Sequence, residues 1–178
     1  MMTIPFSPPY IDENVLKEVE DALKSGWITT GPKVKRLEEL VSHYTKAPNT
    51  LCINSATSGL MLALAWYGVG KGDEVIIPAY TYAATALAVL HVGAIPVMVD
   101  VAKDFNIAIN KIEAAITPKT KAIIPVDIAG WPCDYDAINK LISNKKSLFT
   151  PNTPNQNKLG KILNLADATH PIGAQSKT

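Results

Sequence analysis

The sequence predicts an α/β fold built on a mostly parallel sheet with flanking helices. Two observations lead to this prediction. Beyond residue 50, short apolar runs alternate with helical stretches, and each run is apolar throughout instead of alternating with polar residues. Uninterrupted apolar runs are typical of strands that are covered on both faces, and helices between them serve as crossovers between parallel strands.

The composition is that of a soluble globular protein and excludes several functional classes. Of the 178 residues, 47% are hydrophobic and 19% are charged, with 17 basic against 16 acidic side chains. A net charge of +1 gives no concentrated basic field, so we expect neither nucleic-acid nor membrane partners. The two cysteines form no disulfide framework, the histidines have no metal-ligand spacing, and no signal peptide is recognisable. We therefore expect a cytoplasmic protein without a metal site.

The first 50 residues predict a separate helical segment. Asp12 can cap a first helix, in which apolar residues recur at helical spacing until Gly26 ends it. A turn follows, and Pro32 favours the start of a second amphipathic helix that is broken after Tyr44. We interpret residues 1–50 as an N-terminal helical segment.

Residues 51–178 predict the α/β domain. The expected strands are 51–53, 74–78, 95–100, 121–127 and 162–166, and the expected helices are 58–67, 82–92, 111–116 and 134–142. Gly68 and Gly93 are suited to end the first two of these helices. The stretch from about residue 143 to residue 161 is rich in Asn and Pro, which predicts an exposed loop insertion.

Ligand sites of open parallel sheets lie beyond the carboxyl ends of the strands. The segment Asn54–Gly59 places small residues before a helix, where free N–H groups suit a phosphate, although a plain helix cap explains them equally well. Tyr82 could cover a flat ligand or pack in the core. Asp167 follows a buried strand, so its carboxylate needs a partner such as a cationic ring nitrogen, unless it caps a turn. His170 could contact the same ligand or be structural.

Signatures of other enzyme classes do not fit. The glycines of the segment Gly68–Gly72 follow a helix and precede a strand, which reverses the order of a dinucleotide-binding loop, so an NAD-type oxidoreductase is disfavoured. There is also no Walker-type loop, no serine-centred elbow and no cysteine nucleophile motif.

Seven segments, taken in order, resemble the DegT/DnrJ/StrS family of pyridoxal-phosphate (PLP)-dependent sugar aminotransferases. These segments are Ser25–Val34, Asn54–Leu60, Gly72–Pro78, Tyr80–Thr85, Pro96–Asp100, Gly130–Asp136 and Asp167–Ala174. The resemblance covers the N-terminal half of the family. It implies that residues 51–178 form an incomplete, N-terminal part of the PLP-binding large domain of an aspartate aminotransferase-like, fold type I enzyme.

The resemblance also implies roles for individual residues. Those assigned to the cofactor are Ala56 and Thr57 at its phosphate, Tyr82 on the pyridine face, Asp167 at the protonated pyridine nitrogen and His170 beside the ring. Those expected near the sugar pocket, with a possible contribution across a dimer interface, are Thr29, Thr30 and Gly31.

Three positions depart from the family pattern. Thr169 stands where alanine is usual and Pro171 where serine is usual, and we expect both to tune local packing. Asp127 stands where many members carry histidine, so no substrate contact is assigned to it. The Schiff-base lysine of the family lies beyond the Asp-Ala-x-His segment, and Lys177 follows Asp167 too closely to take that role. We therefore expect a fragment of a longer aminotransferase that is inactive alone.

The implied activity is transfer of an amino group, from glutamate through pyridoxamine phosphate (PMP), to a keto group of a nucleotide-linked sugar. Such reactions belong to amino-sugar and cell-surface polysaccharide biosynthesis, and the full-length enzyme is expected to be a homodimer. Two alternatives stay open. One is a PLP- or PMP-dependent sugar dehydratase of the same family, and the other is a non-catalytic cofactor-binding or regulatory module.

Overall fold

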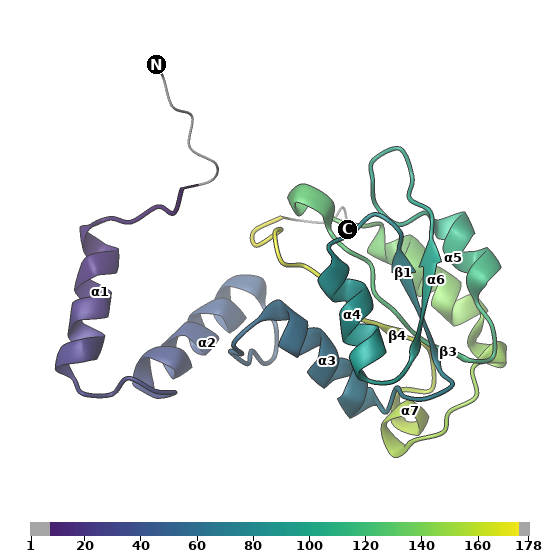
Figure 1. The fold of residues 1–178 in the computed structure, drawn as a ribbon, viewed down its shortest axis with the longest axis horizontal. Coiled ribbons are helices and arrows are strands. Elements are labelled where there is room, and N and C mark those ends of the chain that lie inside the picture. The colour runs from purple at the N-terminus through teal and green to yellow at the C-terminus, as the bar shows by residue number, and fades with distance from the viewer. Residues whose placement is uncertain (1–7, 175–178) are drawn as a thin grey trace. The chain divides into compact units, whose positions relative to one another are not determined.

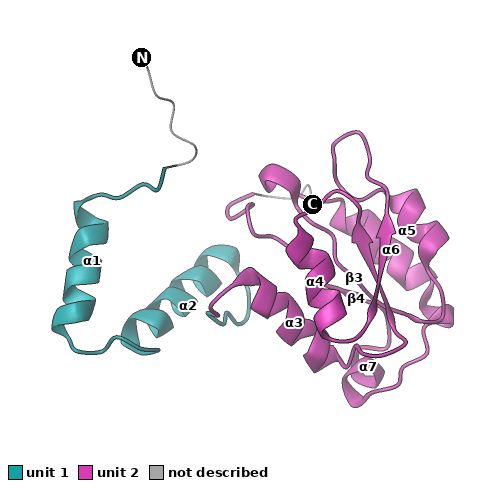
Figure 2. Cartoon of the chain, in the orientation of Figure 1, with its two compact units in different colours: residues 1–52 teal, residues 53–178 magenta. Residues whose placement is uncertain are grey.

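The computed structural model describes residues 8–174. The chain divides into two compact units, residues 1–52 and residues 53–178 (Figure 2). Lys177 lies outside the described residues. No catalytic role is assigned to it.

The first unit contains the two helices that the sequence predicts. Helix α1 spans Glu13–Lys24, and the Asp12 side chain caps it by accepting a hydrogen bond from the backbone N–H of Val15 at 2.9 Å. Helix α2 spans Pro32–Thr45 and begins with proline in its first turn. Neither helix contains a buried residue, so the apolar stripe of each remains exposed within this unit.

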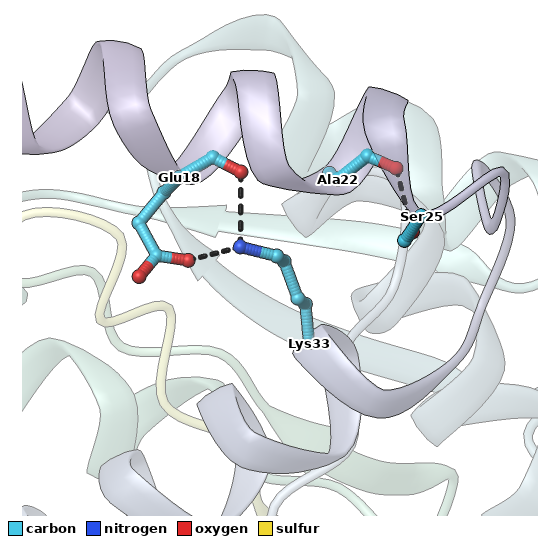
Figure 3. A network of polar contacts seen from close by, with 4 residues as sticks. All are labelled: Glu18, Ala22, Ser25 and Lys33. Atoms are coloured by element: carbon cyan, nitrogen blue, oxygen red, sulfur yellow. Dashed lines mark hydrogen bonds and ion pairs between the residues drawn. The ribbon is translucent and has the colours of Figure 1, made fainter.

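Polar contacts fix the connection between α1 and α2. Lys33 forms an ion pair with the Glu18 carboxylate and donates to the Glu18 carbonyl at 2.9 Å (Figure 3). The hydrogen bond from Lys33, and then its positive charge, lower the pKa of Glu18. Trp27 Nε1 donates to the carbonyl of Thr30 at 3.0 Å, and the indole covers Gly31 so closely that a Cβ there would lie 2.2 Å from Nε1. Only glycine fits beneath that ring.

The second unit is built on a parallel sheet, as the sequence predicts, and the sheet has four strands among the described residues instead of the expected five (Figure 1). The strands are β1 (Glu74–Pro78), β2 (Ile95–Val99), β3 (Thr120–Ile123) and β4 (Leu163–Asn164), in the order β2-β1-β3-β4. An isolated parallel bridge joins Val126 to Asp167 beyond the ends of β3 and β4. This bridge holds the two strand ends together where the sequence analysis places its candidate ligand site.

Helices cover the sheet on both faces. They are α3 (Ala56–Tyr67), α4 (Ala83–His91), α5 (Ile109–Ala115), α6 (Tyr135–Asn144) and α7 (Pro154–Leu159), with short 3-10 turns at Ile128–Gly130 and Lys146–Leu148. Ile76 and Ile77 are adjacent in β1 but belong to two different buried clusters, one on each face. Burial on both faces explains why the strands read as uninterrupted apolar runs. No helix in residues 8–174 is both long and apolar enough to cross a membrane.

The strand predicted at residues 51–53 is wrong. These residues form no strand, and Leu51 and Ile53 are 69% and 44% exposed. The backbone N–H of Cys52 donates to the carboxylate of Glu38 at 2.8 Å instead of to a neighbouring strand. An apolar run of this length carries no information about whether a strand partner lies beside it.

The segment at residues 143–161, predicted as an exposed loop insertion, is mostly exposed but is not a loop throughout. The segment contains α7, whose start is capped by the Thr153 side chain and followed by Pro154. Gln156 of this helix is fully buried. Thr153 and Pro154, which suggested a loop in the sequence, are the N-cap and the first-turn proline of α7. Residues of both kinds are common in loops and also at helix starts.

Candidate active site

A cavity of about 260 Å³ opens in the second unit, at the carboxyl edge of the sheet. It is lined by the start of α3, the start of α4 and the segments that follow β3 and β4. All five residues that the resemblance assigns to a cofactor line it, namely Ala56, Thr57, Tyr82, Asp167 and His170. The structure therefore brings together side chains that are up to 114 positions apart in the sequence. Their individual roles remain predictions.

Asp167 is fixed through both its backbone and its carboxylate. Its N–H donates to the carbonyl of Pro125 at 2.8 Å, and its carbonyl accepts from the N–H of Asp127 at 3.1 Å. Thr85 donates to Oδ2 at 3.4 Å, and Thr169 donates to Oδ1 at 2.5 Å. The expectation that Thr169 serves only packing is incomplete, because its hydroxyl contacts the carboxylate directly.

The N-terminus of α3 keeps two free donors in the cavity. The Ser55 side chain accepts from the N–H of Ser58 at 3.1 Å, and the Ser55 carbonyl accepts from Gly59 at 3.1 Å. Within residues 8–174, no acceptor is bonded to the backbone N–H groups of Ala56 and Thr57. Two unpaired N–H groups at the positive end of a helix dipole form a suitable site for a phosphate.

Tyr82 stands at the N-cap position of α4 and is 83% exposed. The alternative that it is a core aromatic is therefore wrong, and its ring is available to a ligand in the cavity. His170 is also exposed, and its backbone carbonyl would lie 3.2 Å from a Cβ at residue 130. Gly130, with φ +81°, lets the segment after β3 approach the segment after β4.

Thr85 and Asp127 are buried polar residues of this cavity that were not predicted as site residues. Thr85 is 1% exposed. In the sequence, the signal for it was a single hydroxyl residue within the apolar run Ala83–Leu90. Asp127 is 3% exposed, and its Oδ1 accepts from the N–H of Cys133 at 2.8 Å and from the hydroxyl of Tyr135 at 2.7 Å. Burial, then the hydrogen bond from Tyr135 to Asp127, raise the pKa of Tyr135 well above its usual range. Burial and the Asp127 charge likewise raise the pKa of Cys133 to about 12.

The predicted substrate residues lie in the first unit. Thr29, Thr30 and Gly31 form the connection between α1 and α2, where Thr29 and Thr30 are exposed and Gly31 is buried. Their assignment to a sugar pocket remains a prediction.

The cavity has the chemical features that a phosphorylated pyridine requires. It presents two free backbone N–H groups to an anion, a half-buried carboxylate to a cationic nitrogen, and an exposed aromatic ring to a flat face. None of the described residues that line it is a lysine or an arginine. Positive charge in a ligand would therefore meet only carboxylates and His170.

Comparison with known proteins agrees with this chemistry. Residues 9–150 match the DegT/DnrJ/EryC1/StrS aminotransferase family. The spore coat polysaccharide biosynthesis protein SpsC of Bacillus subtilis (strain 168) is 42% identical over 142 residues, which are 79% of this chain and 36% of SpsC. The protein MJ1066 of Methanocaldococcus jannaschii is 42% identical over 176 residues, which are 97% of this chain and 42% of MJ1066.

Among solved structures, the PMP form of "Putative sugar aminotransferase Spr1654" from Streptococcus pneumoniae superimposes with a TM-score of 0.94 at 49% sequence identity. The superposition covers 97% of this chain and 44% of that protein, which has also been solved in a PLP form. This chain thus spans less than half the length of each of these three relatives. The likeness confirms that the fold is part of an aminotransferase fold. Because the family match extends over more than half of its residues, the chain belongs to the DegT/DnrJ/EryC1/StrS aminotransferase family.

Proposed function

We propose that this chain supplies the cofactor-binding part of a PLP-dependent sugar aminotransferase. The observation that carries the proposal is the placement of Asp167 and the open N-terminus of α3 in one cavity of a member of this family. The S. pneumoniae relative, solved with PLP and with PMP, supports the same cofactor here.

Each of these cavity residues would contact a different part of the cofactor. The free N–H groups of Ala56 and Thr57 hold the phosphate, and Tyr82 covers the ring. Asp167 pairs with the protonated pyridine nitrogen, while Thr85 and Thr169 hold its carboxylate in place. His170 borders the ring. When bound, the cofactor carries the amino group and serves as an electron sink for chemistry at the amino carbon.

The proposed substrates are those that the family resemblance implies. We propose glutamate as the amino donor and a keto group of a nucleotide-linked sugar as the acceptor, in a cytoplasmic step of cell-surface polysaccharide synthesis. The name of SpsC, which refers to a spore coat polysaccharide, supports this direction. Thr29, Thr30 and Gly31 would contact the sugar, across the interface of a homodimer.

The 178 residues would not complete the reaction alone. No lysine is present among the described residues that line the cavity, so no amine is available there to move the proton between the substrate carbon and the cofactor carbon. We propose that this lysine comes from the part of the family's length that the chain does not span.

A chimera tests the proposal directly. This chain would replace the aligned 44% of the S. pneumoniae protein, and the relative itself would serve as the reference. We expect glutamate to convert the bound PLP of the chimera into PMP, followed by absorbance, and an Asp167→Asn chimera to lose most of that conversion. A folded chimera that binds no PLP would contradict the proposal, and an active Asp167→Asn chimera would refute the role of Asp167.

A further inference from the structure

Asp127 is a buried carboxylate with one oxygen left free. The residue is 3% exposed and lines the cavity. Both hydrogen bonds that its carboxylate accepts from residues 8–174, from the Cys133 N–H and the Tyr135 hydroxyl, fall on Oδ1. No described donor is bonded to Oδ2. Oδ2 is not among the fully enclosed polar atoms of the described residues, so it can accept a hydrogen bond from a ligand in the cavity.

The backbone holds Asp127 close to the other carboxylate of the site. The Asp127 N–H donates to the Asp167 carbonyl at 3.1 Å, and the neighbouring residues Val126 and Asp167 form the parallel bridge beyond the strands. The carboxylate itself is oriented by residues that follow it in the chain. The N–H of Cys133 and the hydroxyl of Tyr135 both donate to Oδ1, so the fold, and not a ligand, sets the direction of Oδ2.

The charge of the cavity limits what this oxygen can accept. Its described lining includes two carboxylates and one histidine but no lysine or arginine. A ligand that satisfies both carboxylates needs two donor groups. PLP and PMP share the pyridine N–H and the 3-hydroxyl, but at the carbon that changes during turnover PMP carries a donor amine, whereas the aldehyde of PLP can only accept.

We infer that Asp127 is the acceptor for the amine nitrogen of PMP, so that this cavity selects the amine form of the cofactor. The inference rests on the proposed function, because it requires the cofactor to occupy this cavity. It gives Asp127 a role separate from that of Asp167. Asp167 binds the ring nitrogen that all forms of the cofactor share, and Asp127 recognises the group that changes during turnover.

Two probes isolate the amine. PMP and 4-deoxypyridoxine phosphate share the ring and the phosphate, but the second carries a methyl group in place of the aminomethyl group. Each would be titrated into the ¹⁵N-labelled 178-residue chain, with binding measured from amide shifts. We expect PMP to bind about tenfold more tightly, the effect of one charge-assisted hydrogen bond.

Matched variants identify the residue responsible. Asp127→Asn keeps an oxygen to accept from Cys133 and Tyr135 but places an NH₂ group where Oδ2 was, so we expect the tenfold preference to vanish. Asp167→Asn removes the same charge from the same cavity, and it should weaken both probes while leaving their ratio near ten. Tyr135→Phe removes only a donor to Oδ1 and should also preserve the ratio.

The outcomes separate this inference from the proposed function. Equal affinity of the unmodified chain for the two probes would overturn the role of Asp127, whether or not any variant folds. If Asp127→Asn kept the tenfold preference for PMP, another group would be responsible and the inference would be overturned. If Asp167→Asn also lost the preference, the negative charge of the whole cavity would be responsible, which would overturn the inference as well. Absence of saturable binding by either probe would overturn the proposed cofactor site itself.

Discussion

The two ends of α3 satisfy their backbone groups in different ways. At its C-terminus, three side chains from the α7 segment reach back to three successive carbonyls: Asn155 bonds Trp66 at 2.6 Å, Thr153 bonds Tyr67 at 3.0 Å and Gln156 bonds Gly68 at 3.1 Å. At its N-terminus, the N–H groups of Ala56 and Thr57 have no partner among residues 8–174.

Every helix leaves unpaired N–H groups at one end and unpaired carbonyls at the other. In this protein, one end is completed by the chain itself and the other opens into the cavity. We expect the C-terminal end of α3 to contribute to stability and propose that the N-terminal end binds a ligand. Changes at the first end should therefore alter unfolding, and changes at the second should alter binding.

The largest effect is expected from Gln156→Ala. The fully buried Gln156 donates to the Gly68 carbonyl and accepts from the Asn152 N–H at 3.0 Å. Its loss would remove both hydrogen bonds and leave a cavity in place of a fully buried side chain, so we expect the free energy of unfolding to fall by about 4 kcal/mol in urea titrations. Asn157→Ala, at an exposed residue that bonds only within the segment, is the control and should cost less than about 1 kcal/mol. Similar losses in the two variants would contradict a structural role for the Gln156 contact.

A second effect concerns the close approach of α7 to the end of α3. Gly68 has φ +82°, and a Cβ there would lie 2.4 Å from Thr153 Cγ2, whereas Gly72 has φ +90° and an open surrounding. Gly72→Ala should cost about 1 kcal/mol through backbone strain alone, and Gly68→Ala about 3 kcal/mol because the collision adds to that strain. Thermal or urea unfolding of both variants measures the difference, and equal costs would show that α7 does not pack at this position.

Tyr67 links the same end of α3 to the chain before β4, and it should do so in a pH-dependent manner. Its hydroxyl donates to the carbonyl of Lys161, and burial raises the pKa of Tyr67 to about 12 from its usual 10. The unfolded chain therefore loses this proton first as the pH rises, so the contribution of Tyr67 is complete below pH 10 and declines towards pH 12. Tyr67→Phe should cost about 1 kcal/mol at neutral pH, and the gap to the unmodified protein should narrow above pH 10. A gap that stays constant up to pH 12 would argue against the buried hydroxyl.

The smallest effect on stability is expected at the open end, together with a clear effect on binding. Thr57→Asp places a negative charge in the first turn of α3, where the helix dipole should stabilise the fold by about 0.5 kcal/mol. The same charge would repel a phosphate, so we expect PMP binding to be lost. Thr57→Asn, which adds no charge, is the matched control and should retain binding. Undiminished binding by Thr57→Asp in the amide-shift titration would place the phosphate elsewhere.

The sequence by itself determined those features that depend on neighbouring residues. The Asp12 cap, the period of α1, the glycine stops after α3 and α4 and the run of β1 are all encoded within a few positions, and the structure agrees with them. The family resemblance named the five cavity residues. Their positions agree with it, because Ala56, Thr57 and Tyr82 lie at the starts of helices, Asp167 and His170 lie in the segment after β4, and the carboxyl ends of parallel strands meet at one edge of a sheet.

Only the tertiary structure decided the features that depend on distant partners. Residues 51–53 have the sequence pattern of a strand but form no strand in the structure. Gln156 has the sequence context of a loop, but its side chain is buried and donates to the carbonyl of Gly68, 88 positions away. The contact of Thr85 with Asp167 spans 82 positions, and the free oxygen of Asp127 is defined by the groups that bind its other oxygen. A local sequence pattern shows which secondary structure a residue can adopt, whereas strand pairing and burial depend on residues that are distant in the sequence and close in the folded chain.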